Sequence, residues 1–360
     1  MKTLKIGDIT LSVPIIQGGM GVGVSLSGLA VAVANEGGIG VISSAGLGLL
    51  YRELSNDYQE ANNLGLIEEI KKARKETNGI IGVNIMVAMS NFAELVTTSI
   101  KEKIDIIFAG AGLPLKLPSY REPGSKTKLA PIVSSGRAAK IILEKWDSTY
   151  NIVPDAIIVE GPKAGGHLGF KENEIFDENF KLEKLVTAVC QEVKPFEQKY
   201  GKKIPVIAAG GIYTGSDIYN IMKNTGASGV QMGTRFVTTD ECDASDTFKQ
   251  AYINAKAKDI EIINSPVGMP GRAIVNNFIK KIRLGEKHPL RCPFQCIKTC
   301  DVSSSPYCII SALFSAFKGN LESGFAFAGS NAYRATKIMS VKDVFRELKS
   351  EFINAKRNEI

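Results

Sequence analysis

The chain has 360 residues, of which 44% are hydrophobic and 22% charged, so it is expected to fold into one large or two moderate globular domains. This composition excludes disordered and fibrous proteins. The net charge of +7 comes from scattered lysines and arginines, and nucleic-acid binding is therefore not expected. The first twenty residues lack the apolar core of a signal peptide, and no apolar run is long enough to cross a membrane. A cytoplasmic protein without membrane contact is expected.

Short apolar runs recur along the chain between glycine, proline and polar turns. Most of them are apolar at successive positions, which is typical of strands that are covered on both faces of a parallel sheet. Eight strands are predicted in this way, at residues 13–19, 38–44, 80–87, 104–110, 129–135, 156–162, 204–210 and 228–234.

Segments with helical spacing of apolar residues lie between these runs, for example "LIEEIKKARKE" and "LEKLVTAVCQEVKPF". Strands and helices that alternate over about 230 residues are typical of a closed (β/α)8 barrel, the TIM barrel. A doubly wound open sheet is the alternative, but eight strands of such even character favour the barrel.

The last third of the chain, from about residue 240, has helical patterns and no clear strand. We therefore predict a barrel over residues 1–275 and a C-terminal helical extension over residues 276–360, packed on the barrel. Two connections, at about 45–65 and 111–127, are longer than compact folding needs and follow strand ends. They are candidate lids, although plain surface insertions would have the same length.

Glycines cluster where the predicted strands end, which is the catalytic end of a barrel of this type. "AAGGIYTG" follows the seventh strand and "QMGTRF" the eighth. Glycine lets backbone amides approach a ligand closely, so these loops predict a phosphate site made of amides, a helix N-terminus near Ser216 and the hydroxyl of Thr234. No dinucleotide fingerprint or P-loop is present, so a phosphorylated ligand of another kind is expected.

One of only two histidines, His167, stands in "VEGPKAGGHLGF" after the sixth strand, where little bulk can pack against it. A lone histidine is often structural, but this position favours catalysis. His288 has no such setting and is expected at the surface. Tyr213 and Arg235 follow the glycine loops and could contact a ligand or simply pack there.

Four of the six cysteines lie between positions 292 and 308, in "CPFQCIKTCDVSSSPYC". If this segment were helical, Cys292, Cys296 and Cys300 would form one stripe. The spacing matches neither zinc ribbons nor ferredoxins, so reduced thiols are favoured over a metal site and no metal is assigned.

Five motifs in one order carry a family resemblance: "QGGMG", "GVNIM", "VEGPKAGGHLGF", "PVIAAGGI" and "VQMGTRFV". Together they resemble the nitronate monooxygenases, formerly 2-nitropropane dioxygenases, and the related flavin-dependent enoyl-acyl-carrier-protein reductases. The resemblance runs from about Leu4 to Ile274, with a weaker likeness in "GFAFAGSNAYR". "GMPGRAI", near Met269, is a further candidate lining of the pocket.

The resemblance implies a (β/α)8 barrel that binds FMN without a covalent bond. It assigns catalysis to His167. Around the flavin ring it implies Gly19, Met20, Gly21, Asn84, Glu160 and Gly165, and around the ribityl phosphate Gly210, Gly211, Gln231, Met232, Gly233 and Thr234.

Two activities follow from the resemblance, and the residue types suit both. The first is oxidation of alkyl nitronates or nitroalkanes by molecular oxygen with His167 as general base, and this interpretation is preferred. The second is reduction of enoyl thioesters with NAD(P)H. A third alternative is a flavin-binding redox sensor without turnover. All three imply a small-molecule partner, and the physiological substrate, the reductant and a homodimeric state are left open.

Overall fold

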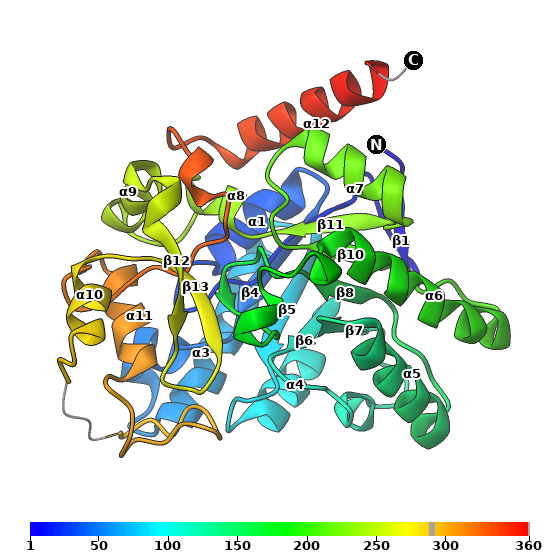
Figure 1. The fold of residues 1–360 in the computed structure, drawn as a ribbon. Helices are drawn as coiled ribbons and strands as arrows, with labels where there is room; N and C mark the ends of the chain where they lie inside the picture. Colours follow the sequence, from blue (N-terminus) through cyan, green and yellow to red (C-terminus); the bar gives the residue numbers. More distant parts are fainter. Residues whose placement is uncertain (288–291, 359–360) are drawn as a thin grey trace.

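Eight parallel strands form a closed barrel in the computed structural model, which describes residues 1–287 and 292–358 (Figure 1). The eight predicted strands are confirmed, and so is the TIM-barrel fold. Around the barrel the order is β10, β11, β3, β4, β5, β6, β7 and β8, with β8 paired to β10. The strands are β3 (Ile15–Gln17), β4 (Ile39–Ser43), β5 (Ile80–Met86), β6 (Ile106–Gly110), β7 (Lys128–Val133), β8 (Ile157–Glu160), β10 (Val206–Ala209) and β11 (Gly229–Met232).

Helices surround the barrel because the strands are apolar on both faces and need cover outside as well as inside. The predicted helical segments are confirmed in α1 (Ser27–Asn35), α3 (Tyr58–Glu76), α4 (Phe92–Lys101), α5 (Gly136–Tyr150), α6 (Leu182–Tyr200) and α7 (Gly215–Thr225). The remaining α-helices are α2 (Leu47–Leu50), α8 (Thr234–Val237), α9 (Asp246–Asn254), α10 (Asn277–Arg283), α11 (Ile309–Phe317) and α12 (Val341–Arg357). Single 3-10 turns lie at Arg52–Leu54, Leu117–Tyr120, Glu172–Glu174, Glu178–Phe180, Ala257–Asp259 and Ala332–Arg334.

The N-terminal end of the barrel is closed by an antiparallel hairpin, β1 (Leu4–Ile6) with β2 (Ile9–Leu11). Leu4, Ile6 and Leu11 of this hairpin are buried in one cluster with the side chains of the barrel interior. The hairpin thus fills the N-terminal end of the barrel interior. Only the C-terminal end of the barrel is left free for a site.

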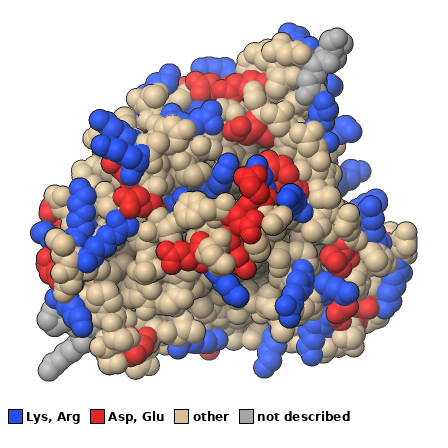
Figure 2. Space-filling view, in the orientation of Figure 1, with Lys and Arg blue, Asp and Glu red and all other residues tan. Residues whose placement is uncertain are grey.

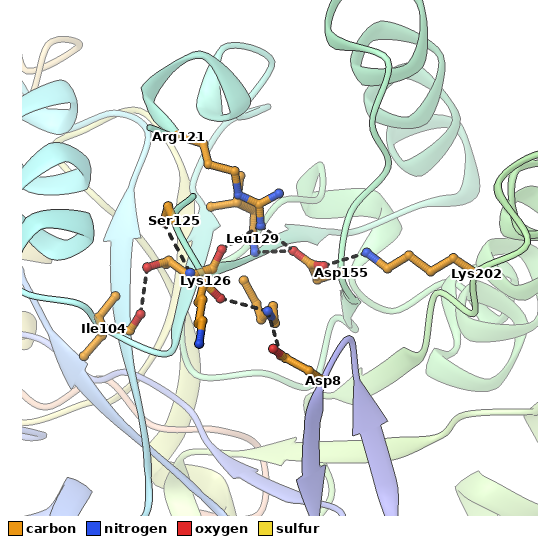
Figure 3. A network of polar contacts seen from close by, with 10 residues as sticks. Asp8, Ile104, Arg121, Ser125, Lys126, Leu129, Asp155 and Lys202 are labelled. Carbon is orange, nitrogen blue, oxygen red and sulfur yellow. Dashed lines mark hydrogen bonds and ion pairs between the residues drawn. The ribbon is translucent and has the colours of Figure 1, made fainter. Parts of the chain in front are cut away.

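Ion pairs surround this closed end (Figure 3). Buried Asp155 accepts hydrogen bonds from Arg121 at 3.0 Å, from Lys202 at 2.6 Å and from the amide of Leu129 at 2.9 Å. Lys128 pairs with Asp8, in the turn of the hairpin, at 2.7 Å. Because each buried charge has a partner, the network avoids the desolvation penalty of an unpaired charge.

The chain after β11 contains strands, which the sequence pattern did not predict. β12 (Ile260–Asn264) and β13 (Pro270–Ile274) form an antiparallel hairpin, and β9 (Gly166–His167) adds to β13. The prediction that the last third has no strand is therefore wrong. The hairpin was missed because its strands are short and one of them, β13, begins with Pro and Gly, which are typical of turns.

The last helix, α12, packs against α7 and also contacts α1 (Figure 1). It therefore completes the ring of helices between the last barrel strand and the first. α9, β12, β13, α10 and α11 lie in the chain between β11 and α12. The division at residue 275 stays a prediction.

Lys and Arg are interspersed with Asp and Glu over the face shown in Figure 2. This agrees with the scattered charges of the sequence. Within the described residues, no helix has the length and apolar character that a membrane span needs. His288, expected at the surface, lies outside the described residues.

Candidate active site

A cavity of about 490 Å³ opens at the C-terminal end of the barrel. Its lining draws on the end of every one of the eight barrel strands, from Gly18 after β3 to Thr234 after β11. A volume of this size suits a cofactor or a drug-sized ligand. The cavity therefore lies where TIM-barrel enzymes carry out their chemistry.

All the residues that the resemblance assigned to a site line this one cavity. His167 is there with Gly19, Met20, Gly21, Asn84, Glu160, Gly165, Gly210, Gly211, Gln231, Met232, Gly233 and Thr234. They come from segments spread over more than 200 positions of sequence, and the fold brings them together. Their individual roles stay predictions.

Two glycines on the wall leave no room for a side chain. A Cβ on Gly19 would lie 2.3 Å from the Cβ of Asn84, and one on Gly165 would lie 2.5 Å from the amide nitrogen of Gly329. Gly210 and Gly211 have positive φ angles, +96° and +81°, which other residues rarely adopt. The wall is thus built from backbone, which gives a ligand access to amide groups.

His167 is held by strand pairing and by a hydroxyl group. It pairs with Gly271 of β13, and its Nε2 lies 2.7 Å from the Oγ of Ser265, in the turn between β12 and β13. The ring of Phe327 packs edge-on against the imidazole, with the centroids 4.9 Å apart. Among the described residues, Nδ1 of His167 has no hydrogen-bond partner, so it is available to a ligand.

Burial shifts the proton affinities of two groups in the cavity. It lowers the pKa of His167 to about 4 and raises the pKa of Glu160 to about 7, because both charged forms lose hydration. Neither side chain has an ion-pair partner within the described residues. At neutral pH the imidazole is therefore uncharged, and Glu160 can both hold and release a proton.

The phosphate end of the predicted site differs in one respect from expectation. The amides of Tyr213 and Thr214 bind the carboxylate of Asp217, and the amide of Gly215 binds Glu351 of α12 at 2.6 Å. These protein carboxylates occupy the first turn of α7. The expected help from this helix N-terminus is thus not supported, and the glycine loops and Thr234 remain as donors.

A comparison with protein families shows to which family the chain belongs. The family model for nitronate monooxygenase matches residues 2–351.

The chain belongs to the nitronate monooxygenase family.

Sequence relatives agree with the family assignment. A probable nitronate monooxygenase of Staphylococcus saprophyticus is 30% identical over 301 residues, covering 78% of this chain and 81% of the relative. A Mycobacterium tuberculosis protein named (3aS,4S,5R,7aS)-5-hydroxy-7a-methyl-1-oxo-octahydro-1H-indene-4-carboxyl-CoA dehydrogenase is 28% identical over 275 residues. That alignment covers 76% of this chain and 66% of the relative, so the chain spans about two thirds of its length.

Solved structures agree as well. FabK from Thermotoga maritima superimposes with a TM-score of 0.75 and 28% identity, covering 97% of this chain and 96% of FabK. Nitroalkane oxidase from Streptomyces ansochromogenes shares the fold, with a TM-score of 0.72 at 20% identity, covering 97% and 98% of the two chains. As a member of this family, the protein is an oxidoreductase of the nitronate monooxygenase type.

Four residues around this family member's site were not assigned from the sequence. Ser265 holds His167 from a position 98 residues away, so no local pattern could reveal it, whereas Phe327, which packs on the imidazole, lies in "GFAFAGSNAYR". Asn331 donates to the carbonyl of Gly211 at 2.6 Å, and the amide of Gly329 donates to Thr234 at 3.0 Å. The likeness in "GFAFAGSNAYR" was the signal for Phe327, Gly329 and Asn331.

Met269, Tyr213 and Arg235 were weaker candidates. Met269 and Tyr213 line the cavity. Arg235 is buried, forms an ion pair with Glu347 of α12 at 2.7 Å and stacks on the ring of Tyr213. In this family member Arg235 therefore supports the wall.

The two candidate lids meet the cavity only in part. Ala45, Gly46 and Tyr58 line it from the first segment, and residues 111–113 from the second. Arg121 of the second segment binds Asp155 at the closed end of the barrel, so that part of the segment runs down the outside. A lid role stays a prediction for the portions that line the cavity.

The segment with four cysteines is an irregular loop, so the helical stripe considered from the sequence is not present. All six cysteines of the chain are free thiols, and Cys296 lines the cavity. Within the described residues, no three His, Cys, Asp or Glu side chains converge on a position for a single metal ion.

Proposed function

We propose that this protein is an FMN-dependent enzyme that oxidises alkyl nitronates, and nitroalkanes after deprotonation, with molecular oxygen. The observation that carries the proposal is the cavity, in which a backbone-lined wall faces a neutral histidine held by Ser265. Its membership of the nitronate monooxygenase family supports the same activity.

The residues present fit a flavin. The cavity has room for a cofactor, and Gly19 and Gly165 pack so closely against Asn84 and Gly329 that neither can carry a side chain, which leaves backbone at the wall. Gly210 and Gly211 bring backbone amides to the opposite end of the cavity. Gly19, Met20, Gly21, Asn84, Glu160 and Gly165 would border the ring, and Gly210, Gly211, Gln231, Met232, Gly233 and Thr234 the ribityl phosphate.

A bound flavin supplies the transfer of electrons, so the protein has to bind the substrate and move a proton. His167 is uncharged at neutral pH because of its burial, and its Nδ1 is free to accept the proton next to the nitro group. Ser265 fixes the ring through Nε2. Glu160, with a pKa of about 7, is a second group that can carry a proton in the same cavity.

The charge of the cavity suits an anion such as a nitronate. Lys163 is the one Lys or Arg side chain among the described residues that line it, and this side chain is exposed next to Gly211. Glu160 in its protonated form does not repel an anion. Below the pKa of Glu160, about 7, a nitronate would therefore meet the Lys163 cation without a facing negative charge.

A second candidate function is reduction of an enoyl thioester with NAD(P)H. Similarity to FabK over nearly the whole of both chains favours it, as does the mycobacterial relative, whose name describes a dehydrogenase of a carboxyl-CoA compound. In this reaction His167 would orient or protonate the thioester side of the substrate.

Two measurements on the purified protein separate these activities. The protein should release FMN when it is denatured, and oxygen uptake with propyl-2-nitronate should exceed NADH consumption with a crotonyl thioester. The opposite ratio would favour the enoyl reductase. Failure to bind FMN, even when it is added in excess, would contradict both activities.

A further inference from the structure

The loop of residues 292–308, here called the cysteine loop, is fixed to its surroundings by several contacts. The amide of Ser90 donates to the carbonyl of Cys296 at 3.1 Å, and the amide of Lys298 donates to Ala88 at 3.0 Å. The ring of Phe294 packs on Tyr58, at the start of α3, with the centroids 5.2 Å apart. The loop therefore has a defined conformation although it is neither helix nor strand.

The four thiols of this loop lie near one another and beside the cavity. Cys296 is buried, and the thiols of Cys292, Cys300 and Cys308 lie close enough to interact with it electrostatically. Cys308 is the N-cap residue of α11. Cys296 and Cys308 pack in one apolar cluster with Val22, Tyr58 and Ile310, and Cys300 packs against the neighbouring cluster around Tyr307.

Neither a disulfide nor a site for a single metal ion accounts for this arrangement. No pair of these cysteines forms a disulfide, and the four side chains do not meet at a point where one ion could be bound. A single zinc ion needs its ligands to converge in this way, with sulfur about 2.3 Å from the metal. A cluster of several metal ions does not, because each thiolate binds a different metal at its own corner.

We propose that Cys292, Cys296, Cys300 and Cys308 bind a four-iron, four-sulfide cluster beside the flavin cavity. Four thiolates from one chain are the usual ligands of such a cluster, one to each iron. The spacing, with three residues between the first three cysteines and seven before the last, allows each thiol a separate corner. The wall at Cys296 would separate the cluster from the cavity.

The surroundings suit a cluster that carries negative charge. The amide of Gln295 donates to the sulfur of Cys292 at 3.4 Å, and such hydrogen bonds to the sulfurs help to set the potential of a cluster. The N-terminus of the nine-residue helix α11 starts at Cys308, where the helix dipole favours an anion. Apolar side chains around Cys296 exclude water.

The test is chemical analysis of the full-length protein, purified without oxygen and, in a second portion, reconstituted with ferrous iron and sulfide. We expect about four iron and four sulfide ions per chain. An electron paramagnetic resonance signal of a reduced cluster should appear after addition of dithionite. FMN is measured on the same samples, so that loss of the cluster and loss of the flavin can be told apart.

Matched cysteine variants assign the ligands. C292S changes a thiol that is partly exposed and should fold, while losing most of the iron. C190S changes a cysteine of α6 outside the loop, at a comparable exposure, and should keep it.

Three results would overturn the proposal: no iron after reconstitution, stoichiometric zinc in its place, or a disulfide within the loop of the anaerobic protein. Iron without FMN would leave the cluster standing and remove the proposed function. FMN without iron would remove the cluster and leave the proposed function standing.

Discussion

The two ends of the barrel treat polar groups in opposite ways. At the N-terminal end, Asp155 is buried and bound to Arg121, Lys202 and a backbone amide. At the C-terminal end, Glu160 and His167 lie half-buried without an ion-pair partner among the described residues, and their pKa values move in the directions that favour the neutral forms. One end uses charge for stability, and the other keeps groups uncharged and ready to exchange a proton.

The difference follows from what closes each end. The β1–β2 hairpin fills the lower end with Leu4, Ile6 and Leu11, so its charges can be satisfied permanently by one another. The upper end is closed by glycine loops and by the β9–β13 contact, which leave a cavity. The hydroxyl group of Tyr213, in the lining of this cavity, is buried without a hydrogen-bond partner among the described residues.

Replacing His167 by alanine is expected to have the largest effect on function. Turnover of a neutral nitroalkane should fall by about 10²- to 10⁴-fold, because the group that takes the proton is gone. Turnover of the corresponding nitronate, which has already lost that proton, should fall far less. Oxygen uptake with the two substrates measures this ratio, and bound FMN should be unchanged. Equal losses on both substrates would remove the role of general base.

Replacing Asp155 by alanine should lower the free energy of unfolding by about 3 kcal/mol, because Arg121, Lys202 and the amide of Leu129 lose the buried carboxylate that they share. FMN content should not change, since the cavity lies at the other end. D8A provides the control: Asp8 is exposed and Lys128 keeps the carbonyl of Lys126 as an acceptor, so loss of this ion pair should cost less than about 1 kcal/mol. Urea unfolding measures both. Similar losses in the two variants would show that burial does not distinguish these pairs.

Substituting Glu160 by glutamine should change how stability depends on pH. The pKa of Glu160 rises on folding from 4.5 to about 7, so its contribution to stability falls as pH increases through that window. The pKa of His167 falls on folding from 6.5 to about 4, so its contribution rises between these values. The two trends oppose each other in the wild type.

In E160Q only the rise from His167 remains. Between pH 4.5 and 6.5 the free energy of unfolding of the variant should therefore increase relative to the wild type, by up to about 2 kcal/mol. Urea unfolding at three pH values checks this. Parallel profiles for the two proteins would mean that Glu160 does not have a raised pKa.

Two neighbouring glycines test the backbone wall. G19A places a Cβ 2.3 Å from that of Asn84 and should cost about 2 kcal/mol of stability and weaken FMN binding. G18A places one at 3.4 Å from the side chain of Gln231, which is ordinary contact, and should retain FMN. Thermal unfolding and flavin titration compare them. If both variants bound FMN equally well, close approach at Gly19 would not matter.

Removal of the Ser265 hydroxyl should have the smallest effect. S265A loses one hydrogen bond to His167, worth about 1 kcal/mol, so kcat on a nitroalkane should fall by about 5-fold. S265T, which keeps a hydroxyl, should recover most of the rate. A shift in the pH profile of kcat would accompany S265A, because the imidazole would lose its fixed orientation. An unchanged kcat and profile would exclude a positioning role.

Much of the fold could be predicted because the barrel strands are continuous apolar runs followed by glycine. The β12–β13 hairpin could not, since "IEIIN" and "PGRAI" are short and the Pro-Gly start of β13 is typical of a turn. Because the hairpin could not be predicted, the contact of Ser265 with His167, 98 positions away, could not be predicted either. The state of the α7 N-terminus was predictable, because Thr214 and Asp217 have the spacing of a capping box.

The last helix also has a consequence for biosynthesis. α12 covers the groove between α7 and α1, buries Phe345 there, and fixes the glycine loop through Glu351 and the bond to Gly215. Residues 341–357 leave the ribosome only after all eight strands have been made. The nascent barrel is therefore expected to carry an uncovered apolar seam next to a glycine loop that still lacks its bond to Glu351, until this helix docks late in translation.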